Sequence, residues 1–168
     1  FKEDSTLFIA TTDGAFKSIN AGGTWKNITG NYFQSRILEI SSSPNFVNDQ
    51  TIFIGTLGDF LYKSVDGGDS WKQLNESQTV SDSRVQALDI SPNFVNDSTV
   101  FAGAGTGGIL RTVNAGKEWV SVKQGKTVPR IRTIELSPKF QYTKNIIYTT
   151  TEGGILRSVD GGINWERS

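Results

Sequence analysis

The 168-residue chain contains no histidine, no cysteine and no methionine. It therefore lacks the commonest zinc ligands and the usual catalytic imidazole or thiolate, and its fold owes nothing to disulfide bonds, so we expect no metal and no cofactor. No stretch approaches the roughly 18 consecutive apolar residues of a membrane-spanning helix, so membrane insertion is not expected. Basic and acidic residues are balanced at 17 each and are mixed along the chain, which argues against nucleic-acid binding because that needs a basic face.

What the chain does have is internal repetition. Its four tryptophans are spaced by 46, 48 and 46 positions: Trp25, Trp71, Trp119 and Trp165. Each closes an eight-residue phrase with Ser or Thr first, Asp or Asn third and Gly fifth. These phrases, called the box turns below, span residues 18–25, 64–71, 112–119 and 158–165. A second phrase, Ser-Pro-x-Phe, begins at Ser43, Ser91 and Ser137. A fixed period of this length is typical of solenoids, propellers and repeat arrays.

Within one repeat the pattern predicts four short strands. Residues 84–91 alternate and are rich in β-formers, 92–98 are polar and turn-like, 99–103 form a short apolar run, 109–113 form a third strand, and 119–122 begin a fourth. No window has a helical period with caps. We therefore predict an all-β chain, a β-propeller built of four-stranded antiparallel blades. The expected blades are 1–33, which is incomplete, 34–80, 81–126 and 127–168.

The box turns have a structural explanation. Asp or Asn in a tight turn accepts hydrogen bonds from backbone N–H groups just downstream, and the following glycines take positive φ. The residues expected to do this are Asn20, Asp66, Asn114 and Asp160. Interchange of Asp and Asn favours this role over calcium binding, which loss of charge would weaken. Each Trp is expected to bury its ring between neighbouring sheets.

The phrase Ser/Thr-x-Asp/Asn-x-Gly-x-x-Trp resembles the Asp box, or BNR repeat, of sialidases, xyloglucanases, sortilin-type receptors and photosystem II assembly-factor propellers. The resemblance covers all four repeats and implies a β-propeller. It does not imply one function, because these relatives include hydrolases, receptors and assembly factors. In the family the box joins the third and fourth strands, away from the usual binding face, so the box residues are not expected to bind a ligand.

Enzyme activity is the alternative. The resemblance to sialidases implies an arginine triad introduced by Arg-Ile-Pro, but the nearest string is Pro129-Arg130-Ile131-Arg132, with its elements in another order. Xyloglucanases place two carboxylates in a cleft between two propellers, and a glycosidase pair must lie about 5 to 10 Å apart. Asp13, Asp59 and Glu152 are all expected between second and third strands, which could bring them to one rim. We favour solvated turn acids over a catalytic pair.

Three arginines recur seven positions before the Ser-Pro phrase, at Arg36, Arg84 and Arg130. In a propeller the first strand of each blade lines the central channel, so these side chains are expected to converge at the channel mouth, opposite the box turns. Converging guanidinium groups suit carboxylates or phosphates. The assembly-factor resemblance also implies an arginine patch for a partner. Alternatively, each Arg pairs with a rim acid, Asp13, Asp59, Asp82 or Glu152, and merely connects adjacent blades.

Other recurring residues receive no site role. A basic residue precedes each box turn, and its long stem is expected to cover apolar neighbours. These residues are Lys17, Lys63, Arg111 and Arg157. Sequons of the N-glycosylation type begin at Asn27, Asn75 and Asn96, and in a chain rich in Asn, Ser and Thr they are weak indicators.

The ends of the sequence suggest a segment. Phe1 stands in the register of Phe46, so the first repeat lacks its innermost strand, and the last repeat stops just inside its outermost strand. This provides about fifteen strands and leaves an edge unpaired, which favours pairing with other chains. We expect further blades of a longer propeller, roughly six to eight in all, or a partner chain that completes the ring.

The sequence thus favours a non-catalytic recognition or assembly scaffold that binds an acidic group of a protein or glycan partner through the arginines. It is expected to be extracellular, on the cell surface or periplasmic. The alternatives are a fragment of a carbohydrate-active hydrolase with its catalytic residues elsewhere, and a structural subunit of a surface layer or large complex.

Overall fold

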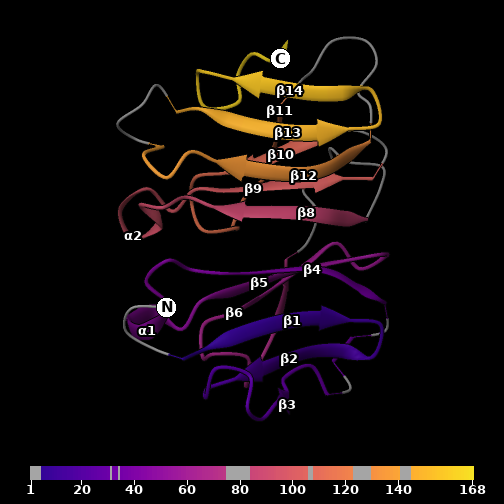
Figure 1. Ribbon diagram of the computed structural model, residues 1–168, viewed down its shortest axis with the longest axis vertical. Helices are drawn as coiled ribbons and strands as arrows, with labels where there is room; N and C mark the ends of the chain where they lie inside the picture. Colours follow the sequence, from indigo (N-terminus) through magenta and orange to yellow (C-terminus); the bar gives the residue numbers. More distant parts are fainter. Residues whose placement is uncertain are drawn as a thin grey trace.

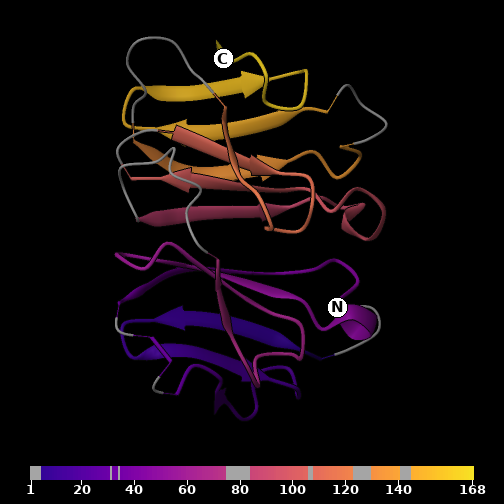
Figure 2. The same cartoon turned by 180° about the vertical axis from the view of Figure 1, so that it is seen from behind.

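The computed structural model describes residues 5–30, 32–33, 35–74, 84–105, 108–122, 130–140 and 145–168. Its strands form four separate antiparallel sheets that follow one another along the long axis of the molecule (Figures 1 and 2). Within each sheet, successive strands of the chain are hydrogen-bonded neighbours. This is the blade arrangement of a β-propeller, and the predicted fold class is confirmed.

The sheets are described here by their strands. The first contains β1 (Leu7–Thr11), β2 (Gly14–Ser18) and β3 (Lys26–Asn27). The second contains β4 (Ile37–Ser42), β5 (Ile52–Thr56), β6 (Leu61–Ser64) and β7 (Lys72–Leu74). The third contains β8 (Val85–Ile90), β9 (Val100–Ala104), β10 (Gly108–Thr112) and β11 (Val120–Val122). The fourth contains β12 (Ile131–Leu136), β13 (Ile147–Thr151), β14 (Gly154–Ser158) and β15 (Glu166–Arg167). We call them blades 1 to 4.

Two single turns of helix occur in the otherwise all-β chain. Single-turn helices, α1 (Phe46–Asp49) and α2 (Phe94–Asp97), connect the first and second strands of blades 2 and 3. The Ser-Pro phrase closes each turn locally, since Ser91 Oγ donates to Asp97 Oδ2 at 2.6 Å and Thr99 N donates to Asp97 Oδ1 at 2.9 Å. A four-residue helix is too short to leave a helical period in the sequence, which is why pattern analysis missed it.

The box turns lie between the third and fourth strands of each blade and repeat one hydrogen-bond network. In blade 2, Ser64 Oγ donates to Asp66 Oδ1 at 2.7 Å and accepts from Gly68 N at 2.8 Å, while Ser70 N donates to Asp66 Oδ1 at 2.9 Å. Asn114 takes the same role in blade 3, accepting from Glu118 N at 3.0 Å. The predicted turn role of Asp and Asn is therefore confirmed, and it needs only the side-chain oxygen.

Aromatic pairs join consecutive blades. Phe53 of blade 2 packs edge-on against Phe94 of blade 3, with ring centroids 6.0 Å apart. The same arrangement recurs as Phe8 with Phe46 and Phe101 with Phe140. These rings belong to hydrophobic clusters that each draw residues from two blades, so burial of apolar surface holds the blades side by side.

The basic residue before each box turn has a more specific place than its predicted covering role. Lys63 lies over the Phe53 ring at 5.4 Å, as expected of a long stem on an apolar neighbour, but its Nζ also donates to Ala115 O in the next blade at 3.0 Å. Lys17 does the same towards Gly67 O at 3.2 Å. The lysines therefore connect one blade to the box turn of the next.

The box tryptophans of blades 2, 3 and 4 pack against the preceding blade. Trp119 is 3% exposed and packs on residues of blade 2, and Trp71 Nε1 donates to Ile28 O of blade 1 at 2.7 Å. Trp25 is 39% exposed, so its predicted burial between sheets is wrong within this chain. The reason is geometric: each box Trp packs against the preceding blade, and Trp25 belongs to blade 1.

Several predictions lie outside what the structure describes. The blade division at 33/34 meets residue 34, and the divisions at 80/81 and 126/127, with Asn75 and Asp82, also fall outside the described residues.

Asn27 of the first sequon uses its Oδ1 to accept from Thr29 N at 2.8 Å and from Gly30 N at 3.0 Å. Neither helix of the described chain is long and apolar enough to cross a bilayer.

Candidate ligand-binding edge

The three repeated arginines lie at one edge of the sheets. Arg36, Arg84 and Arg130 immediately precede β4, β8 and β12. Two of these positions are fixed by backbone bonds to the end of the second strand, Leu57 N to Arg36 O at 2.9 Å and Gly105 N to Arg84 O at 3.0 Å. Because strands alternate in direction, the box turns and both helices lie at the opposite edge (Figure 1). We call the two sides the arginine edge and the box edge.

The three arginines differ in their surroundings. Arg36 is exposed and has no ion pair with any described residue. Arg84 is half-buried and has an interaction partner. Arg130 is exposed, and its Nε donates to Gly105 O of the preceding blade at 3.3 Å. Arg130 therefore matches the alternative role of connecting blades, whereas Arg36 matches a side chain available to a ligand.

The rim acids lie where the sequence predicts, in the turns between second and third strands. Asp13, Asp59 and Glu152 therefore share the arginine edge. Asp59 Oδ2 accepts from Ser35 N at 3.1 Å. Glu152 Oε1 lies 2.8 Å from Arg132 Nη2 but 4.0 Å from Arg130 Nη1. Two of the three carboxylates are thus held in local contacts, and Asp13 is exposed.

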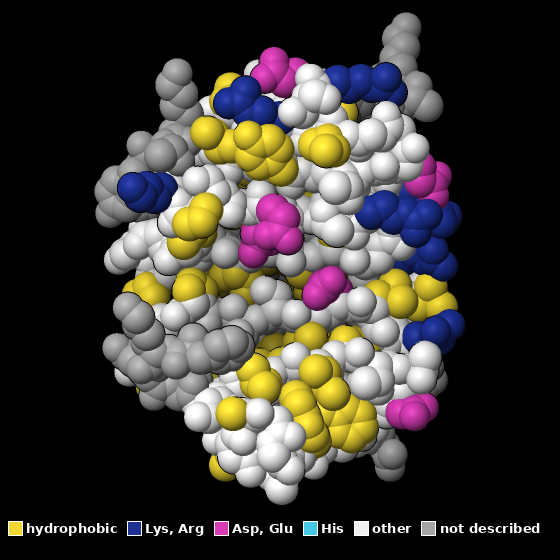
Figure 3. Space-filling model, viewed as in Figure 1, with side chains coloured by type: hydrophobic (Ala, Val, Ile, Leu, Met, Phe, Trp, Pro, Cys, Tyr) yellow, Lys and Arg dark blue, Asp and Glu magenta, His cyan; other side chains and the backbone are white. Residues whose placement is uncertain are grey.

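Sequence analysis missed Arg132 as a member of this edge. It is two residues inside the strand that Arg130 precedes and holds Glu152 more closely than Arg130 does. With Arg36, Arg84 and Arg130 it makes the edge basic, and Figure 3 shows Lys and Arg side chains gathered on the side where β4, β8 and β12 begin in Figure 1. Arg132 stands at an irregularity in the pairing of β12 with β13, between Ile131 and Thr133, where the regular alternation of side chains is interrupted. The sequence pattern therefore carried no signal for it.

A pocket of about 190 Å³ opens at this edge between blades 1 and 2. Arg36 and Asp13 both line it, together with Thr12, Phe33 and Ser35. It combines one basic and one acidic group with hydroxyls and a single aromatic ring. Such a lining can orient a polar group by hydrogen bonds, and it is smaller than the 300 to 1,000 Å³ typical of sites that enclose a whole small molecule.

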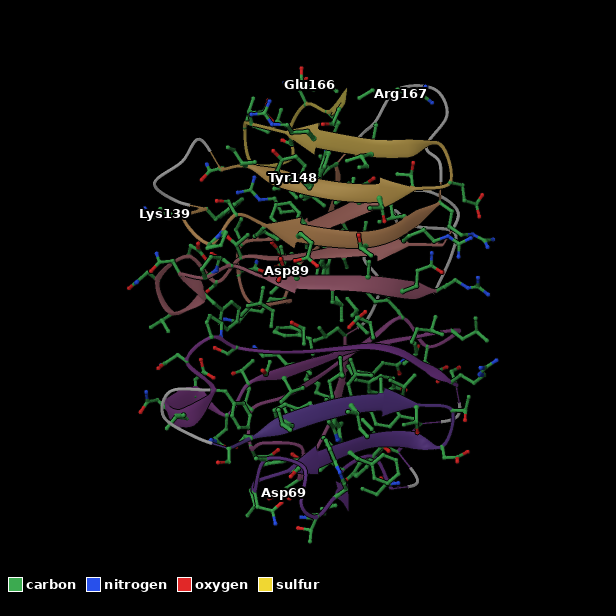
Figure 4. All side chains as sticks on the ribbon, viewed as in Figure 1. Asp69, Asp89, Lys139, Tyr148, Glu166 and Arg167 are labelled. Carbon is green, nitrogen blue, oxygen red and sulfur yellow. The ribbon has the colours of Figure 1, made fainter. Side chains whose placement is uncertain are left out.

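A second group of charges, also missed from the sequence, lies on the face formed by the first strands. Glu39, Asp89 and Glu135 come from β4, β8 and β12. Asp89 connects two blades, since its Oδ2 accepts from Leu136 N of blade 4 at 2.6 Å, while its Oδ1 accepts from Ile90 N at 2.8 Å. Figure 4 shows Asp89 on β8, and Figure 3 shows acidic side chains near the middle of the same face.

Burial raises the pKa values of two of these groups, Asp89 and Glu39. Desolvation raises the pKa of Asp89 to about 6 against the bonds from Leu136 and Ile90, and the negative charges of Glu135 and Glu39 raise it further. Burial likewise raises the pKa of Glu39, with a smaller contribution from Glu135. The face therefore carries a carboxyl group that titrates near neutral pH, which is a property of buried acids in general and of some catalytic acids.

Comparisons with known proteins support the fold. No family model and no curated protein matches the chain. Among solved structures, an ancestral GH74 enzyme is similar over 98% of this chain and 22% of its own, with 23% identity and a TM-score of 0.77. YCF48 from Cyanidioschyzon merolae is similar over 98% of this chain and 56% of its own, with 20% identity and a TM-score of 0.66.

Two further structures extend this range. YCF48 bound to D1 peptide is similar over 98% of this chain and 50% of that chain, at 14% identity and a TM-score of 0.67. The extracellular domain of BT4673 from B. thetaiotaomicron is similar over 97% of this chain and 21% of its own, at 12% identity and a TM-score of 0.69. The present chain thus spans between about a fifth and just over half of these proteins. Identities this low establish the fold alone.

Proposed function

We propose that the chain is part of a non-catalytic recognition or assembly scaffold that binds an acidic group of a protein or glycan partner at the arginine edge. The observation that carries the proposal is Arg36, an exposed guanidinium without an ion pair among the described residues, at the mouth of a polar pocket. A guanidinium in that setting can grip a carboxylate with two parallel hydrogen bonds.

The neighbouring arginines would extend this contact. Arg84 and Arg130 stand at the same position of the next two blades, so a partner that spans the edge would meet them in sequence. The ion pair between Arg130 and Glu152 is long, at 4.0 Å, and solvent-exposed, so it contributes little to stability. An acidic group of a partner could take the place of Glu152 at little energetic cost. A YCF48 propeller has been solved with a bound D1 peptide, which supports a peptide segment as the partner class.

A hydrolase fragment is the second candidate, and its support is the likeness to an ancestral GH74 enzyme. On this reading the catalytic groups would lie outside the chain given, because Asp59 and Glu152 of the arginine edge are already engaged by Ser35 N and Arg132. A structural subunit, with the arginine edge covered by a neighbouring chain, is the third. An extracellular, cell-surface or periplasmic location of the protein would agree with the extracellular domain found among the similar structures.

Binding of a fluorescein-labelled peptide of ten glutamates, followed by anisotropy, tests the proposal. The variant Arg36→Ala/Arg84→Ala/Arg130→Ala should bind the peptide with an affinity at least roughly tenfold lower than that of the parent chain. Binding to the parent chain should weaken as the salt concentration is raised. The control Lys26→Ala/Lys139→Ala/Arg167→Ala removes the same charge elsewhere and should bind like the parent. Equal losses in both triple variants, or binding indifferent to salt, would contradict the proposal. Circular dichroism melting verifies that each variant remains folded.

A further inference from the structure

A groove of about 360 Å³ lies on the box edge between blades 2 and 3. Lys63, Lys72 and Lys117 stand around apolar surface from Val65, Leu74 and Ala115. We call it the lysine groove. Its volume is within the range of small-molecule sites, and Val65 in its lining is 63% exposed, which leaves apolar surface in contact with water.

The positive charges of the three ammonium groups repel one another. Burial lowers the pKa of Lys63. The positive charge of Lys117 lowers this pKa further, the negative charge of Asp49 acts in the other direction, and Lys72 adds a smaller lowering effect. Asp49 is already occupied, because its carboxylate accepts from Ser43 Oγ at 2.6 Å and from Thr51 N at 2.9 Å. Among the described residues that line the groove there are three lysines and no carboxylate.

Lys63 keeps hydrogen-bonding capacity towards the groove. Its Nζ donates to Ala115 O at 3.0 Å, and an ammonium group carries three donors, so this bond occupies one of them. The contact fixes the Lys63 side chain beside the groove without neutralising its charge. A negative group entering the groove would meet a donor that is already positioned.

The equivalent groove between blades 1 and 2 has the same backbone but a different set of charges. Between blades 1 and 2 a groove of about 340 Å³ is lined by Lys17, Lys26 and Asp69 at the corresponding positions. Lys26 Nζ and Asp69 Oδ1 form an ion pair at 3.0 Å. Two lysines and one aspartate give a formal charge of +1, whereas three lysines give +3 in the lysine groove.

The boundary between blades 3 and 4 differs again. In the register of the repeats its residues are Arg111, Val120 and Ile163, one basic and two apolar. Three blade boundaries of the same architecture therefore carry an acid–base pair, a lysine triad and an apolar pair. The triad is a property of this one boundary and is not demanded by blade packing.

We propose that the lysine groove binds a small organic anion, a carboxylate carried on an apolar body. The carboxylate would be held by Lys63, Lys72 and Lys117, and the body would cover Val65 and Leu74. Binding would remove the repulsion among the lysines and the exposure of Val65 together. This site lies at the box edge, away from the arginine edge, so the proposal goes beyond the proposed function and does not depend on it.

NMR of the chain with ¹³C-labelled lysine, titrated with 2-naphthoate, tests the proposal. The ε-CH₂ signals of Lys63, Lys72 and Lys117 should shift together, and the pKa of Lys63 should rise on binding. Uncharged 2-naphthamide and acetate, which has no apolar body, should each bind at least tenfold more weakly. Naphthoate shifts spread over all lysines, or acetate binding as tightly as naphthoate, would overturn the proposal.

Charge exchange between the two grooves provides the decisive variants. Lys117→Asp gives the lysine groove the charges of its neighbour and should weaken naphthoate binding roughly tenfold. Asp69→Lys should create a second site, seen as new shifts of Lys17 and Lys26, a gain that unfolding cannot produce. Arg167→Asp makes the same charge change as Lys117→Asp, at the end of the molecule opposite Asp69 (Figure 4), and should leave naphthoate binding unchanged. Absence of both the loss and the gain would refute a site built on the lysine triad.

Discussion

Titration of Asp89 should make the chain more stable in mild acid than at neutral pH. Its pKa is about 6 in the folded protein against an ordinary value of 3.8. Because the folded value is raised, the carboxylate is disfavoured by folding, so stability is greatest when the group is protonated and declines as pH rises from 3.8 through 6. A difference of about 2 pKa units corresponds to roughly 3 kcal/mol, which we take as an upper value.

The assay is urea unfolding followed by tryptophan fluorescence between pH 4 and 7.5. The free energy of unfolding should fall by about 1 to 3 kcal/mol across this range, with Glu39 contributing in the same direction because its pKa is also raised. Asp89→Asn removes the titration and should flatten most of the slope, although it also weakens the bond that Leu136 N donates. Asp69→Asn, at an exposed position, should keep the parent slope. Stability that rises between pH 4 and 6, or a slope unchanged in Asp89→Asn, would refute this reasoning.

Three further predictions concern folding. Trp71→Ala should lower the free energy of unfolding by about 3 kcal/mol, whereas Trp25→Ala, at a 39% exposed side chain, should cost about 1 kcal/mol by urea titration. Gly55→Ala should cost about 2 kcal/mol, because a Cβ there would lie 2.6 Å from the Val85 carbonyl oxygen, while Gly108→Ala meets no atom within 4 Å and should be tolerated in thermal melts. Asp66→Asn should lower the free energy of unfolding by less than about 1 kcal/mol at pH 7. Turn hydrogen bonds lower the pKa of Asp66 to about 2, so the parent should lose stability as the pH falls below 3.8, and the variant should lose less.

The sequence predicts the repeated features well and the contacts between repeats poorly. Box turns are local, so Asp66 and its hydrogen bonds to Ser64 and Ser70 can be foreseen from eight residues. Asp89 could not be assigned a role, because its partner Leu136 belongs to another blade. The bond from Lys63 to Ala115 O also crosses a blade boundary and joins residues 52 positions apart in the sequence.

The same distinction explains the mixed outcome at the arginine edge. Register fixed the positions of Arg36, Arg84 and Arg130 at the start of three strands, because every repeat counts from the same phrase. The partner of each guanidinium depends on the turn between the second and third strands, either of its own blade or of the preceding one, and those turns differ. Glu152 is close to Arg132, while Asp59 accepts from a backbone N–H, so equivalent arginines meet different surroundings.

Differences between equivalent positions are therefore the most informative residues in this chain. The backbone of the box turn tolerates Asp69 in one blade and Lys117 in the next, so neither is required by folding. On the first strands, Ser41, Asp89 and Glu135 occupy one register, so the architecture does not require an aspartate there, and burial raises the pKa of Asp89 to about 6. Some charged residues are not required by the fold and lower its stability. For these residues, binding of a ligand or partner is the simplest explanation. Each can be tested against its own counterpart in the neighbouring blade, because the repeats supply a control with the same backbone.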